Sequence, residues 1–157
     1  MNAAHYHIAL THTPLTGIVS GFALLLAGVI LKNTTLKKAA LYFFLISAAI
    51  AVPVYLSGQG AEKVLKSFLP NMPHEVIEQH EEMAALALGG SIILGVISLV
   101  FAIVFRGERQ LTNMMALILI VIALIVIVLT GYTANLGGKI RHVEIRASIE
   151  HKSLWLS

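Results

Sequence analysis

Four runs of apolar residues follow one another along the chain, with polar segments between them. The runs cover about residues 8–31, 39–56, 83–105 and 111–132. Each approaches the ~20 residues that a helix needs to cross the hydrocarbon core of a bilayer. They are too long and too continuous for the strands of a membrane barrel. The pattern predicts an all-α integral membrane protein with a single four-helix domain over residues 1–157.

The connections between the runs predict the topology. Residues 32–38 (KNTTLKK) and 106–110 (RGERQ) are tight polar turns, whereas residues 57–82 form one long connection. Short connections make consecutive helices antiparallel neighbours, so we expect an up-down-up-down bundle. Within the long connection, residues 60–69 (GAEKVLKSFL) have apolar positions on one helical face. This predicts a short interfacial helix, ended by Pro70 and Pro73, before a helix that leads into the third span.

Composition supports the bilayer as solvent and excludes several functions. The chain is 57% hydrophobic and only 12% charged, about half the charge of a soluble domain. It contains no Cys and no Asp, which excludes disulfides, thiolate chemistry and a Ser-His-Asp triad. Its scattered basic residues do not form the stripe typical of nucleic-acid binding. The uncharged start MNAAHYH, without an A-x-A site, predicts a retained first span rather than a cleaved signal peptide.

Basic residues give a moderate indication of orientation. The N-terminal flank carries no Lys or Arg, and the first helix usually dominates insertion. We therefore expect both tight turns in the cytoplasm and both termini in the periplasm of a bacterial inner membrane. The number of basic residues at each end weakly opposes this orientation, because five lie at the tight turns and six lie at the other end. The five are Lys32, Lys37, Lys38, Arg106 and Arg109, and the six are Lys63, Lys66, Lys139, Arg141, Arg146 and Lys152.

All seven histidines fall at the end of the bundle opposite the tight turns. They are His5, His7, His12, His74, His80, His142 and His151. His12 and His80 open the first and third spans, which are diagonal in a four-helix bundle. Two inward-facing imidazoles can bind haem b from above and below the ring. The pattern thus predicts a bis-histidine cytochrome that carries electrons, rather than a catalyst, between a membrane partner or quinol and an acceptor outside.

The other histidines have secondary predicted roles. His7 and His142 form either a second haem pair or hydrogen bonds to propionates, so one or two haems are expected. Arg141 and Lys139 either neutralise propionates or anchor the helix at the interface. His5 and His151 are expected in solvent, and His74 in the long connection.

Two other classes remain open. The His cluster, with Glu78, Glu81 and Glu82 nearby, could bind Cu or Zn, although no HExxH motif is present. A metal transporter usually has polar or broken spans, whereas the second and fourth runs are uniformly apolar. Alternatively, the chain is a cofactor-free assembly subunit of a membrane redox complex. A homo-oligomer is compatible with any of these.

Gly17 and Gly21 lie away from the direction of His12 on an ideal helix, so we assign them to helix packing.

Several segments resemble a bacterial family of small four-helix membrane proteins, the domain of unknown function 2231. HIALTHTPL is similar to its His-x4-His-x-Pro opening, IEQHEEMA to the start of its third helix, and TANLGGKIRHVEI to its closing segment. YLSGQGAEKV resembles its second helix exit. The resemblance implies a haem- or redox-linked protein, with the family's histidines at His7, His12, His80 and His142. Thr13 and Val143 depart from the family pattern, and the second departure bears on His142.

Overall fold

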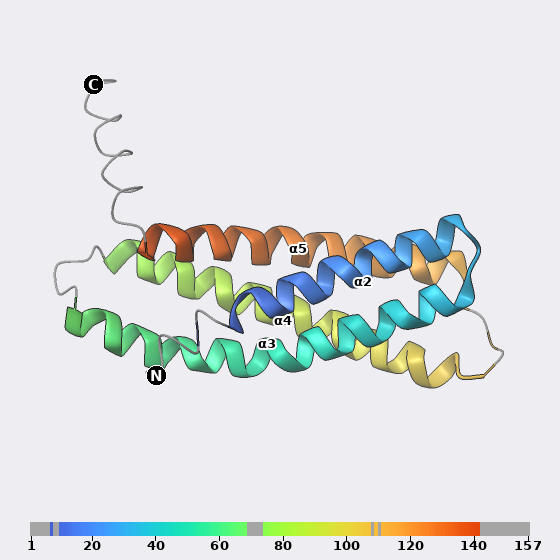
Figure 1. Cartoon of the computed structure of the whole chain (residues 1–157), viewed down its shortest axis with the longest axis horizontal. Helices are drawn as coiled ribbons and strands as arrows, with labels where there is room; N and C mark the ends of the chain where they lie inside the picture. The colour runs from blue at the N-terminus through green and yellow to red at the C-terminus, as the bar shows by residue number, and fades with distance from the viewer. Residues whose placement is uncertain (1–6, 8–9, 69–73, 108, 110, 142–157) are drawn as a thin grey trace, which may run out of the picture.

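The computed structural model describes residues 7, 10–68, 74–107, 109 and 111–141, and it contains four long helices (Figure 1). They are α2 (His12–Ile30), α3 (Thr34–Phe68), α4 (His74–Val104) and α5 (Asn113–Arg141). No strand occurs in these residues. The predicted all-helical class is therefore confirmed for the described part of the chain.

The helices form a four-membered ring in which consecutive helices are neighbours. α2 packs on α3, α3 on α4, α4 on α5, and α5 returns to α2. The chain runs up and down along the long axis, with the two tight turns at one end (Figure 1). This places α2 and α4 on one diagonal, as the run order predicts.

The long connection differs from its prediction. α3 continues without interruption through Phe68, so residues 60–68 extend the second helix and do not form a separate interfacial one. The physical reason is local: after Pro53, which the helix accommodates, no proline occurs before Pro70 to stop it. α4 begins at His74 and runs through the third apolar run, as predicted. Pro70 and Pro73 lie outside the described residues.

Both tight turns are closed by capping groups. At the end of α2, the N–H of Lys32 donates to Val29 and the N–H of Asn33 donates to Gly28. This is the Schellman pattern, with Lys32 at φ 51° in the left-handed position. Asn33 then caps α3, because its Oδ1 accepts from the N–H of Leu36 at 3.1 Å. The Thr112 hydroxyl caps α5 in the same way.

All four helices are long and apolar enough to cross a membrane. Their outer faces carry large apolar side chains, as lipid contact requires. On α5 six of these are more than half exposed: Met114, Leu117, Val121, Leu124, Ile125 and Val128. A patch this large is unusual on a soluble monomer.

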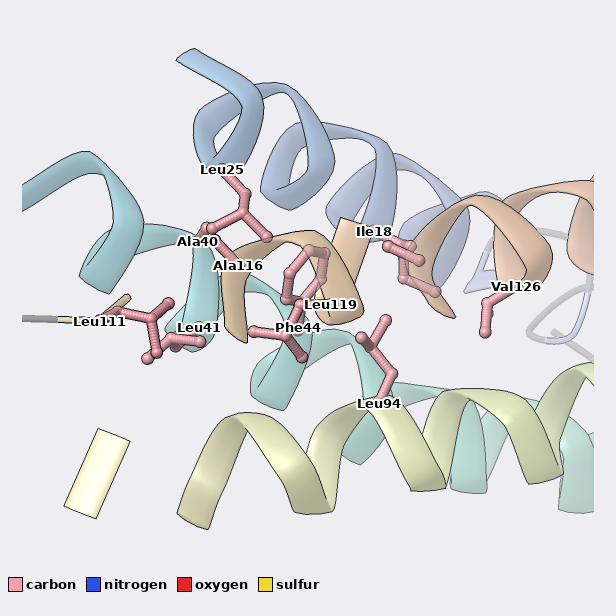
Figure 2. Close-up of a cluster of buried hydrophobic side chains, with 11 residues drawn as sticks. Ile18, Leu25, Ala40, Leu41, Phe44, Leu94, Leu111, Ala116, Leu119 and Val126 are labelled. Atoms are coloured by element: carbon pink, nitrogen blue, oxygen red, sulfur yellow. The ribbon is translucent and has the colours of Figure 1, made fainter. Parts of the chain in front are cut away.

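A packed apolar core lies in the half of the bundle next to the tight turns (Figure 2). Phe44 is fully buried there, and side chains from all four helices gather around it. The cluster comprises Ile18, Leu25, Ala40, Leu41, Phe44, Leu94, Leu111, Ala116, Leu119, Ala123 and Val126.

Glycines allow the helices to approach closely. A Cβ added to Gly17 would lie 2.1 Å from Ser47 Oγ, and one added to Gly21 would lie 2.7 Å from the Phe44 ring. A Cβ on Gly95 would lie 2.5 Å from the Ala48 Cβ. The packing role predicted for Gly17 and Gly21 therefore matches their contacts with α3.

Candidate functional site

His7 contacts α3 just after the proline of that helix. Its Nδ1 lies 3.1 Å from the carbonyl oxygen of Val54 and 2.9 Å from Ser57 Oγ. The Ser57 hydroxyl donates to the same carbonyl at 2.7 Å. A carbonyl can only accept, so these contacts place the proton of the neutral ring on Nδ1 and leave the lone pair on Nε2.

His80 makes the corresponding contact on the other side of the bundle. It lies on α4, and its Nδ1 is 3.0 Å from the carbonyl oxygen of Thr133 on α5. The same argument assigns its ring proton to Nδ1 and its lone pair to Nε2. Holding Nδ1–H on a backbone carbonyl is a common way to orient a histidine that binds a metal through its other nitrogen.

Both rings are partly buried. Burial lowers the pKa of His7 below its ordinary value, and the hydrogen bond to Val54 partly opposes that shift. His7 is therefore neutral at physiological pH, the form in which imidazole binds iron. Neither Nε2 is hydrogen-bonded to another described residue.

The His7–His80 site lies at one level of the bundle. Val54 and Thr133 each follow the start of their helix by about 20 residues, or roughly 30 Å. That distance equals the thickness of a hydrocarbon core. α2 begins at this level, while α3, α4 and α5 extend beyond it (Figure 1). Hence, if the bundle spans a bilayer, the site lies at the interface opposite the tight turns.

His12 lies at the same level but faces outward. Its side chain is exposed, whereas Pro14 and Ile18 form part of the buried face of α2. Two residues along a helix correspond to about 200°, which turns His12 away from the side of Pro14. His12 lines an outer groove of about 430 Å³ between α2 and α3, with Thr16, Ser20, Phe43 and Ile50 among its walls. The exposed ring of His12 therefore does not share the partly buried setting of His7 and His80.

Glycines lie beside both inward-facing rings. A Cβ added to Gly58 would lie 3.5 Å from Cε1 of His7, and one added to Gly137 would lie 3.3 Å from Cε1 of His80. A methyl at Gly58 would just fit against its ring, and one at Gly137 would be crowded, so each imidazole packs directly against the helix that carries its glycine.

The remaining predicted site residues are less informative. His5, His142 and His151 lie outside the described residues. Arg141 is the last residue of α5, and His74 is the first of α4. Among the residues described, no group of three or more His or Glu side chains could hold a metal ion. This part of the structure gives no support to a Cu or Zn cluster.

Sequence reasoning missed the backbone partners of the two histidines. The sequence around Val54 or Thr133 does not mark their carbonyls as acceptors, because every residue has a backbone carbonyl. Ser57 could have been noticed, since it is a polar residue at the end of the second apolar run.

Comparison with protein-family models, with curated proteins and with solved structures finds no match to this chain.

Proposed function

We propose that the chain is a membrane-integral b-type cytochrome module in which His7 and His80 bind haem b through Nε2. The observation that supports this most strongly is the matched state of the two rings. Both hold Nδ1 on a backbone carbonyl, and neither Nε2 is hydrogen-bonded to another described residue. Two such imidazoles are the usual axial ligands of a low-spin haem.

The surroundings of the rings suit this role. Gly58 and Gly137 let the rings pack directly against α3 and α5, and Ser57 helps to fix the orientation of His7. Bound haem would supply a one-electron carrier, while the residues here orient the imidazoles and keep them neutral. Lys139 and Arg141, near the end of α5, would neutralise propionates in this proposal. The resemblance to the domain of unknown function 2231 carries the same expectation.

The proposal includes a place for the electron donor. The groove beside His12 opens between α2 and α3 and is lined mainly by polar residues of α2 and mainly by apolar residues of α3. A quinol has a polar ring and an apolar tail, so it matches these two walls. His12 would then contact the quinol rather than the iron.

A spectrum and four alanine variants test the haem ligands. Protein expressed with a haem precursor should show a Soret band and split visible bands in the reduced-minus-oxidised spectrum. His7→Ala and His80→Ala should each lose these bands, while His5→Ala and His12→Ala keep them. A spectrum lost in His12→Ala but kept in His7→Ala would contradict the His7–His80 pair and support the His12–His80 pair. A colourless, folded wild type would favour the cofactor-free assembly subunit.

Membrane insertion and orientation need a separate test. We propose that the four helices span a bacterial inner membrane with the tight turns in the cytoplasm. The protein should then resist extraction by alkaline carbonate and require detergent. A reporter that works only in the periplasm should be active when it is fused after Ser157. If instead a reporter that works only in the cytoplasm is active there, the orientation is reversed. Extraction without detergent would contradict insertion.

A further inference from the structure

The end of the bundle that carries the tight turns has a small pocket that the haem proposal does not use. It has a volume of about 210 Å³ and lies between α3 and the end of α4. Lys38 and Arg106 supply two positive charges to its wall, and Tyr42 supplies a phenol. Leu41 and Phe105 form an apolar side. Two cations beside an apolar wall match a molecule that is anionic at one end and apolar at the other.

The two cations have free hydrogen-bonding capacity. Lys38 Nζ donates to the carbonyl of Gly107, which uses one of its three N–H groups. This contact also holds Lys38 against the turn after α4, where Gly107 adopts a φ of 64° that favours glycine. The Arg106 side chain is exposed and makes no hydrogen bond with the described residues. Its planar guanidinium can bind two phosphate oxygens at once.

From these features we propose that the pocket binds an anionic phospholipid. The phosphate lies between Lys38 and Arg106, and an acyl chain runs along the apolar surface between α3 and α4. Charge complementarity favours this occupant: the two tight turns contain five basic residues and one acidic residue, Glu108. Basic pockets between helices on the cytoplasmic side commonly bind anionic headgroups. The inference rests on the proposed membrane insertion but not on haem.

Lipid titration of the purified protein in a neutral detergent tests the site. Native mass spectrometry would follow phosphatidylglycerol binding, with phosphatidylcholine as the neutral-headgroup comparison and glycerol phosphate as the headgroup without acyl chains. Wild type should bind phosphatidylglycerol in preference to the other two. Lys38→Gln and Arg106→Gln should each weaken that binding about fivefold, the effect of one basic residue near a membrane surface.

Arg109→Gln is the matched control. It removes the same charge from the same turn, and Arg109 is an exposed residue that does not line the pocket. An equal loss in Arg109→Gln would show that diffuse charge attracts the lipid, and would overturn the site. So would unchanged binding in Arg106→Gln. Glycerol phosphate that competes as well as the lipid would assign the pocket to a soluble phosphate. None of these readouts uses the haem spectrum or carbonate extraction, so failure of the lipid site can be told apart from failure of the haem or insertion proposals.

Discussion

The two ends of the bundle are built in opposite ways. At the tight-turn end, four helices close around Phe44, and capping groups satisfy the turns. At the histidine end, only α3, α4 and α5 continue past the start of α2. There His7 contacts a carbonyl of α3, and His80 contacts a carbonyl of α5. Apolar packing stabilises the first end. At the second end, polar contacts and glycines bring the imidazoles against α3 and α5.

Under the proposed function, this difference assigns stability and haem binding to separate regions. A change in the packed half should lower stability without altering the imidazoles, and a change at the histidines should remove a cofactor while the fold persists. The predictions below test that separation, from the largest expected effect to the smallest.

Phe44→Ala should give the largest loss of stability. The side chain is fully buried among residues from all four helices, and emptying such a site costs about 3–5 kcal/mol. Thermal unfolding in detergent would measure the loss. The adjacent Phe43 is 42% exposed, so Phe43→Ala should cost much less. Equal losses in both variants would contradict a core centred on Phe44.

Lys37→Met should destabilise the tight-turn end by about 1–3 kcal/mol. Lys37 is only 7% exposed, and its Nζ donates to Asn113 Oδ1 at 2.7 Å and to the Leu111 carbonyl at 3.3 Å. These bonds tie α3 to the start of α5. Lys32→Met, at an exposed position of the same turn, serves as the control for lost charge. A melting temperature unchanged by Lys37→Met would mean that the tie contributes nothing to stability.

Gly95→Ala should cost about 1–3 kcal/mol, because its new methyl would meet the Ala48 Cβ, which is fixed to the backbone. Gly89→Ala is the control, since nothing lies within 4 Å of its added Cβ.

Gly17→Leu should also lower the melting temperature, because its side chain would meet Ser47 on α3, while the haem spectrum is retained. Loss of haem from a stable Gly17→Leu protein would show that this glycine faces the cofactor.

Acid should weaken the contact between His7 and α3, which is the smallest effect. The folded-state pKa of His7 lies below its ordinary value, so between these two values the unfolded chain binds more protons. This contribution to stability is present above the ordinary value of 6.5 and is lost as the pH falls through the folded pKa. The melting temperature of His7→Gln should therefore fall less than that of wild type between pH 7.5 and pH 5. Identical pH profiles would contradict a buried, neutral His7.

Hydrophobic run length was enough to predict the helices, the turns and the diagonal placement of α2 and α4, because long apolar runs have few alternatives in lipid. The end of α3 was missed because amphipathic spacing in residues 60–69 does not distinguish a new helix from an extended one. Depth along the chain suggested His12 as a ligand, and this stays a prediction; the structure places its side chain on the exposed face of α2, opposite Pro14 and Ile18. His7 precedes α2, so helical periodicity could not show where it would pack.

Imidazole rescue is the most direct test of the His7–His80 pair. Oxidised wild type should show the electron paramagnetic resonance signal of low-spin haem with two imidazole ligands. His7→Gly and His80→Gly should each lose that signal, and millimolar imidazole should restore it by entering the space left by the missing ring. His12→Gly should keep the signal without added imidazole. A low-spin signal that survives in His80→Gly, or one that His12→Gly alone removes, would contradict the assignment of the site to His7 and His80.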